Sequence, residues 1–115
     1  MKTSNYGALA LIAALLVLPG CGGKGWEETG RQGRMHFVVV DDDSRELMQD
    51  AAREICDDRP SCSVLFWANR AQAATRLPMT DAQVAAQIGR YDLNKNTGFD
   101  RWMFRCADRP GSNCY

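Results

Sequence analysis

The residues from Cys62 to Asn69 form the densest apolar run outside the first twenty residues of the chain. The run is short, contains both Phe66 and Trp67, and follows Pro60 closely. A short apolar and aromatic segment of this kind predicts a β-strand that is buried on at least one face. We therefore expect the rest of the fold to be assembled around this strand.

Two segments before the central strand have clear secondary-structure patterns. Residues 35–40, Met-His-Phe-Val-Val-Val, are rich in β-branched and aromatic side chains and predict a first strand. Apolar residues recur at helical spacing from Ser44 to Cys56, with charged residues between them, which predicts an amphipathic helix. Asp43 is the expected N-cap of this helix, and Pro60 marks its end because proline cannot continue a helix.

Two further segments follow the central strand. Residues 80–83, Thr-Asp-Ala-Gln, match a capping box and predict a second helix. Its buried stripe begins at Val84 and continues to Ile88 and Tyr91. Residues 99–106 alternate between two sets of side chains, which predicts a third strand.

The chain of 115 residues is long enough for one domain. The order strand-helix-strand-helix-strand predicts a small α+β or α/β domain over residues 34–115, with a three-stranded sheet, two helices and disulfide staples. Residues 21–33 contain five glycines and have no apolar period. We therefore expect a flexible tether there, of roughly 20 Å reach.

The first twenty residues have the composition of a secretory signal peptide. Lys2 gives a positively charged start, residues 8–18 are continuously apolar, and Pro19, Gly20 and Cys21 follow. The apolar run is too short for a membrane-spanning helix, which needs about 20 residues. We therefore predict that the signal is removed on export.

The end of this segment, Leu18-Pro19-Gly20-Cys21, resembles the lipobox of bacterial lipoproteins. Leu18, Gly20 and Cys21 match the pattern, while Pro19 stands where a small or β-branched residue is more common. The resemblance implies that the peptide is cut before Cys21 and that the Cys21 thiol receives a diacylglycerol, with palmitate among the acyl chains. Gly22, rather than an aspartate, follows Cys21, which is similar to the outer-membrane sorting pattern.

The lipoprotein resemblance covers residues 1–21 alone and implies a location. It places the protein in the bacterial cell envelope, lipid-anchored, at the outer membrane and facing the periplasm. Loss of Lys2 with the signal leaves thirteen basic and fourteen acidic side chains, a net charge of minus one. We therefore expect no nucleic-acid partner.

Four cysteines follow Cys21, and an even number in an exported chain is typical of a disulfide framework. Of the three pairings that four cysteines allow, we predict Cys56–Cys62, which a helix end and a strand start bring within reach. The second pair, Cys106–Cys114, would tie down the C-terminal tail. A zinc site is the alternative, although spacings of six and eight residues are longer than usual for zinc ligands.

Few residues offer catalytic or metal-binding chemistry. His36 is the single histidine, it lies in a predicted strand, and no nucleophile motif flanks any serine or cysteine. The carboxylates of Asp41–Asp43 precede a helix, where negative charge is stabilising without any metal. Residues 92–98 imitate a calcium loop, but Met103 stands where its bidentate glutamate should be. We expect no metal and no cofactor.

The central strand is apolar on both sides, so the arrangement of the two helices decides what is buried. We expect one helix on each face, in which case Trp67 is a core residue. If both helices lay on one face, the other face would be partly open and would form a candidate binding face. That face would present Leu65, Trp67, Arg101, Met103 and Arg105.

These features predict a lipid-anchored envelope protein that acts as a binding or structural module for a protein, peptide or cell-wall partner. The alternative is a small periplasmic hydrolase-like enzyme that uses His36 or the Asp41–Asp43 cluster. Enzymatic activity is the less favoured hypothesis, and the sequence leaves the ligand and the oligomeric state open.

Overall fold

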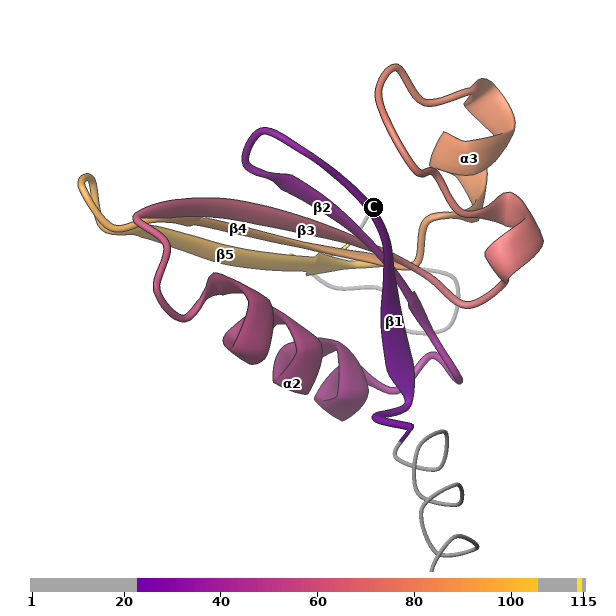
Figure 1. The fold of residues 1–115 in the computed structure, drawn as a ribbon, viewed down its shortest axis with the longest axis horizontal. Coiled ribbons are helices and arrows are strands. Elements are labelled where there is room, and N and C mark those ends of the chain that lie inside the picture. Colours follow the sequence, from indigo (N-terminus) through magenta and orange to yellow (C-terminus); the bar gives the residue numbers. More distant parts are fainter. Residues whose placement is uncertain (1–22, 106–113, 115) are drawn as a thin grey trace, which may run out of the picture.

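The computed structural model describes residues 23–105 and residue 114, and its centre is a sheet with helical segments on both faces (Figure 1). Eight elements follow one another within these residues. They are β1 (Trp26–Gln32), β2 (Met35–Val40), α2 (Arg45–Cys56), β3 (Ser61–Trp67), the 3₁₀ turn η1 (Arg70–Gln72), α3 (Asp81–Ala86), β4 (Gly89–Asn94) and β5 (Phe99–Phe104).

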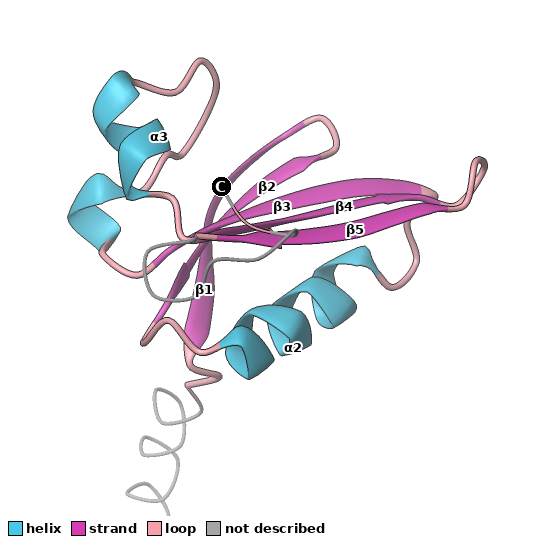
Figure 2. Cartoon of the chain, turned by 180° about the vertical axis from the view of Figure 1, so that it is seen from behind, coloured by secondary structure: helices cyan, strands magenta, loops and turns pink. Residues whose placement is uncertain are grey.

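The sheet has five strands in the order β1-β2-β3-β4-β5, so every strand lies beside its neighbours in sequence. β2 and β3 are parallel and are joined by α2, whereas the other three pairs are antiparallel. α2 lies along one face of the sheet, and η1 and α3 lie on the other (Figure 2). The fold is therefore mixed α+β, as predicted, with β3 as the central strand.

The prediction of a three-stranded sheet is wrong, and one missing strand is β1. Residues 26–32 lie within the predicted tether but pair with β2 along its whole length. β1 is an edge strand with a mostly polar sequence, so it lacks the apolar pattern of a buried strand. Gly33 and Arg34 form the turn into β2, and Gly33 has a φ of +61°, which glycine adopts without strain.

The other missing strand is β4. Thr80 caps α3 with the predicted capping box, but the helix ends at Ala86 and does not continue to Tyr91. The chain then becomes extended and pairs on one side with β3 and on the other with β5. The residues that imitate a calcium loop, 92–98, form the last three residues of β4 and the turn into β5, where Gly98 has a φ of +79°.

The larger core lies between α2 and the sheet. α2 begins at Arg45, and its N-cap is Ser44 rather than the predicted Asp43, because the Ser44 hydroxyl accepts a hydrogen bond from the Leu47 amide at 3.2 Å. The apolar stripe of α2 covers alternate residues of β2 and β3. The core side chains are Val38, Val40, Met48, Ala51, Ala52, Cys56, Cys62, Val64, Phe66 and Phe104.

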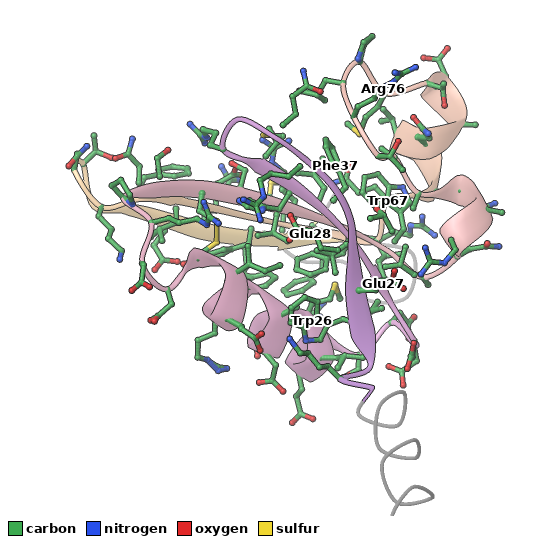
Figure 3. All side chains as sticks on the ribbon, in the orientation of Figure 1. Trp26, Glu27, Glu28, Phe37, Trp67 and Arg76 are labelled. Atoms are coloured by element: carbon green, nitrogen blue, oxygen red, sulfur yellow. A yellow bond between two sulfur atoms is a disulfide. The ribbon has the colours of Figure 1, made fainter. Side chains whose placement is uncertain are left out.

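A smaller core lies on the opposite face. η1, the loop after it and α3 cover Phe37, Leu65 and Trp67, and Figure 3 shows Phe37 and Trp67 on the α3 side of the sheet. This cover reaches across β1, β2 and part of β3. Of the described elements, none packs over the same face of β4 and β5, where Phe99 and Arg101 are exposed, and we call this part of the sheet the open face.

Candidate functional site

The structure divides the residues of the candidate binding face between core and surface. Leu65 and Trp67 are fully buried, and Trp67 Nε1 donates a hydrogen bond to the Gln83 carbonyl oxygen at 2.8 Å. Trp67 is thus a core residue, as we expected for helical segments on both faces, and it is not available to a partner. Arg101 is exposed and Met103 is half-buried, so these two residues remain accessible.

Arg105 is exposed, but its guanidinium already has protein partners. It donates hydrogen bonds to the carbonyl oxygens of Ala85 and Gln87, at 3.0 and 3.1 Å. Carbonyl groups at the C-terminal end of a helix lack partners within the helix. Arg105, the residue after β5, therefore fastens the end of α3 to the end of that strand.

The residues of the hydrolase-like alternative do not meet. His36 is fully buried, its Nδ1 lies 2.8 Å from Glu28 Oε2, and its Nε2 has no hydrogen-bond partner. Asp41–Asp43 are exposed and follow the last residue of β2, whereas His36 is the second residue of that strand. His36 and Asp41 are five residue steps apart along the extended chain, which is roughly 17 Å. The pair formed by His36 and Glu28 is better explained as a partly buried polar contact between β1 and β2.

The predicted disulfide between Cys56 and Cys62 is present, with its Cα atoms 5.7 Å apart. It joins the end of α2 to the start of β3, and it removes both thiols from any zinc site. Cys114 is also disulfide-bonded. Its predicted partner Cys106 and the predicted lipidation site Cys21 lie outside the described residues.

A cleft of about 460 Å³ opens between the C-terminal half of α2 and the adjacent face of β4 and β5. The fold explains where the cleft lies. α2 packs over β2 and β3, and the part of this sheet face that β4 and β5 form is therefore left uncovered at the side of the helix. The residues that line the cleft come from α2, from β4 and β5, and from the segments that follow α2 and β4. They are Gln49, Ala52, Arg53, Cys56, Asp57, Tyr91, Leu93, Lys95, Asp100 and Trp102.

The sheet side of the cleft is aromatic. Tyr91 and Trp102 are directly opposite each other on β4 and β5, and their ring centroids are 4.7 Å apart. Trp102 also stacks on Phe104 at 5.3 Å and on Phe66 at 5.9 Å. Because its ring is held by three others, Trp102 gives the cleft a rigid wall, and it remains half-buried rather than enclosed.

The rim of the cleft is polar and carries both signs of charge. Arg53 and Lys95 are basic, and Asp57 and Asp100 are acidic. Burial, a hydrogen bond with Asp100 and the negative charge of Asp100 together raise the pKa of Tyr91 to about 12. The Tyr91 hydroxyl therefore stays protonated at neutral pH and acts as a polar group within the aromatic wall.

The cleft thus joins an aromatic and apolar wall to a rim of polar and charged side chains, and a concave surface with both kinds of group can hold a small molecule or a side chain. The sequence-based candidates did not include these residues, because Tyr91 was placed on a helix. One signal was available: residues 89–94 alternate, so that Tyr91 and Leu93 share a face, and an Asn- and Gly-rich turn follows. This pattern is typical of the first strand of a hairpin.

Among the residues that the structure describes, no cluster of three His, Cys, Asp or Glu side chains is arranged to hold a metal ion. In the same part of the chain, no helix is long and apolar enough to cross a membrane. The fold and the cleft define an α+β domain with an aromatic-walled recess beside α2. Neither protein-family profiles, nor curated sequences, nor solved structures yield a match to this chain.

Proposed function

We propose that the protein is a lipid-anchored binding module of the bacterial cell envelope and that the cleft between α2 and β4–β5 is its ligand site. The observation that carries the proposal is the cleft itself. Its volume of about 460 Å³ falls within the usual range of ligand pockets, which is roughly 300–1,000 Å³. Its aromatic wall and polar rim supply the two kinds of contact that such sites combine.

The lining favours a ligand that carries an apolar or planar group and little net charge. Such a group would contact Trp102, Tyr91 and Leu93, where aromatic side chains offer large contact areas. The two basic and two acidic residues at the rim would hydrogen-bond a neutral polar chain. A short peptide, or a cell-wall fragment that contains peptide, has both features.

The envelope location rests on the lipobox-like residues that end at Cys21. Attachment there would hold the domain at a membrane surface, and more than one acyl chain is needed for stable anchoring. A module held in this way would meet peptides and wall fragments in the periplasm. The charge balance of the chain, close to zero, is consistent with such a role and not with binding of nucleic acid.

The proposal is tested by titrating the full-length protein with soluble disaccharide-peptides released from cell wall and with short apolar peptides. Saturable binding is expected, read from tryptophan fluorescence and from amide shifts of the cleft residues. Leu93→Gln should weaken binding about tenfold, because it places an amide against the apolar group of the ligand.

Val84→Gln is the matched control, since Val84 is a half-exposed apolar residue on α3, away from the cleft. It should bind like the wild type. If neither probe binds saturably, or if the Leu93 and Val84 variants lose affinity equally, the cleft is not the ligand site.

A further inference from the structure

Three arginines surround Asp92 on the open face, which lies on the side of the sheet opposite α2. Arg101 of β5 is directly opposite Asp92 of β4, so both side chains project from the same face. Arg90 lies two residues before Asp92 on β4 and therefore shares that face. Arg34, in the turn before β2, brings its Nη2 within 3.8 Å of Asp92 Oδ1. We call these four residues the arginine cluster.

Asp92 holds the side chains of Arg90 and Arg34 in fixed positions. Arg90 donates to both carboxylate oxygens, at 2.7 and 3.1 Å, and the Ser63 hydroxyl donates to Oδ1 at 2.6 Å. Arg34 donates in turn to the Ser63 hydroxyl oxygen at 2.9 Å. The carboxylate thus holds the guanidinium groups of Arg90 and Arg34 in place on the open face.

The acidic side chain of the cluster offsets one of its three positive charges. Arg34 and Arg90 keep side-chain exposures of 49% and 37%, so each still presents unused N–H donors to solvent. Arg101 is exposed and forms no ion pair with any described residue. Apolar side chains adjoin the cluster on β5, where Met103 is half-buried and Phe99 is 48% exposed.

We propose that the arginine cluster, with Phe99 and Met103 beside it, binds an acidic peptide segment of a partner protein. The planar guanidinium group matches a carboxylate with two parallel hydrogen bonds, which gives specificity as well as attraction. The excess positive charge complements a segment that carries several carboxylates. A peptide can also place apolar side chains on Phe99 and Met103, which an inorganic anion cannot do.

The position of the cluster favours a protein partner over lipid headgroups, and this step rests on the proposed anchor. Asp92 is in register with Ser63 of β3 and, through it, with Met35 at the start of β2. β1 begins at Trp26, which pairs with Val40 at the opposite end of β2. The cluster is therefore roughly 17 Å further along the sheet than the point at which the chain would leave the membrane.

Fluorescence anisotropy of the full-length protein in a neutral detergent tests the proposal. The probe is a labelled peptide of alternating glutamate and leucine. The control peptide is the same sequence with glutamine in place of each glutamate. The acidic peptide should bind about tenfold more tightly, and the difference should shrink as salt is added, because exposed charges are screened. Arg101→Gln should weaken the acidic peptide roughly fivefold, as expected for one exposed charge pair.

Arg76→Gln is the control, since it removes the same charge from an exposed arginine in the loop before α3 (Figure 3). It should leave binding unchanged, and so should Leu93→Gln, which separates this site from the cleft. Equal affinity for the two peptides, or equal loss in the Arg101 and Arg76 variants, would overturn the proposal. So would Arg101-dependent binding to phosphatidylglycerol vesicles without binding to the acidic peptide, because the ligand would then be lipid.

Discussion

Trp67 is the largest fully buried side chain of the structure's described part, and it joins the sheet to the segment that covers it. Its ring packs against Phe37 at 6.2 Å, and its indole N–H is bonded to the Gln83 carbonyl oxygen. Trp67→Ala leaves a large cavity and an unpaired carbonyl group, so the free energy of unfolding should fall by about 3–5 kcal/mol. Thermal melts of the wild type and the variant measure this loss.

Trp26→Ala is the comparison for these thermal melts. Trp26 is half-buried on the edge strand β1, so its substitution should lower the free energy of unfolding by less than Trp67→Ala does. A loss of about 1 kcal/mol shifts the melting temperature of a domain of this size by roughly 4–8 °C. A shift of only a degree or two for Trp67→Ala would mean that the cover over β2 and β3 is loosely held.

Asp92 should make the stability of the domain sensitive to acid. Burial alone would raise the pKa of Asp92, but hydrogen bonds from Arg90 and Ser63 and the charges of Arg90 and Arg34 outweigh it, so the pKa is lowered. A carboxyl whose pKa is lower in the folded state stabilises the fold above its unfolded pKa. That contribution is lost as the pH falls through the folded value.

The variant Asp92→Asn isolates this effect. At neutral pH it should be less stable than the wild type, and the difference should narrow as the pH falls below about 4, the usual range of an aspartate. Urea unfolding at a series of pH values measures both. A difference that stays constant down to acid pH would show that packing, and not the charge of Asp92, is responsible.

At the scale of elements, the covering loop is fastened to β1 at Gly30. A Cβ atom added there would lie 2.1 Å from the Thr75 carbonyl oxygen, which is backbone and cannot turn aside. The same region is held by Thr29, whose hydroxyl donates to the Ala74 carbonyl oxygen at 3.0 Å. Gly30→Ala should therefore push the loop from the strand and cost about 1–3 kcal/mol.

Gly98→Ala is the matched control for Gly30→Ala, measured by the same chemical unfolding. Gly98 has a positive φ but no neighbouring atom within 4 Å of an added Cβ, so its substitution introduces backbone strain without a collision. Equal amide-exchange protection of residues 70–79 in the Gly30 variant and in the wild type would contradict the proposed contact.

The disulfide between Cys56 and Cys62 stabilises the crossing from α2 to β3. It closes a short loop, for which chain entropy gives a stabilisation of about 2–3 kcal/mol. The double variant Cys56→Ser, Cys62→Ser should lose that amount while keeping its fold, because the sheet does not depend on the bond. Thiol titration of the unfolded wild type should detect no free thiol at these positions, and two reactive thiols would contradict the structure.

The elements with strong apolar patterns were predictable from the sequence, and the polar strands were not. β2, β3, α2 and β5 each bury a regular set of side chains, and these sets have the spacing of a strand or a helix. β1 is polar and is the edge strand of the described sheet, and none of its residues is fully buried. Its place in the sheet depends on pairing with β2, and the pattern of apolar residues within residues 26–32 does not indicate that pairing.

The same reason explains why the cleft was missed while Trp67 was placed correctly as core. Trp67 lies in the densest apolar run, which predicts a buried strand, and its burial then required only that helical segments cover both faces of that strand. The cleft depends on Tyr91 and Trp102 being opposite each other, and hence on the register of two strands. Arg101 and Met103 were predicted to lie on a binding face only if both helices covered the other face of the sheet. The positions that Asp92 gives to the Arg90 and Arg34 side chains depend on tertiary contacts, which no local pattern indicates.

At the scale of the whole molecule, a net charge near zero hides an uneven distribution of charge. Asp41–Asp43 are exposed beside the start of β1, where the Asp41 amide donates a hydrogen bond to the Gly25 carbonyl oxygen at 2.8 Å. The arginine cluster lies toward the other end of β2 and β3, on the open face. With the proposed anchor, the acidic end would face the anionic membrane surface and the basic face would be directed away from it.

If Cys21 carries the proposed anchor, the position of β1 limits how far the domain can lie from the membrane. Because β1 begins at Trp26, four residues, 22–25, separate it from Cys21, in place of the longer tether that the glycine content suggests. Even fully extended, this stretch spans at most roughly 17 Å, so the domain would be held close to the bilayer. Cys21→Ser should abolish lipid attachment and move the protein from the membrane to the soluble fraction of cell extracts.

Two measurements test the proposed anchor. One is mass spectrometry of the N-terminal peptide, and the other is fractionation of cells that contain the wild type or Cys21→Ser. The wild type should start at Cys21, carry acyl chains and need detergent for extraction. Insertion of a flexible Gly-Ser segment after Gly23 should leave it membrane-bound, since the anchor and the folded domain are unchanged, but should expose β1 to added protease more readily. A soluble, unmodified wild-type chain would contradict the anchor, and it would also remove the reason for orienting the arginine cluster away from the membrane.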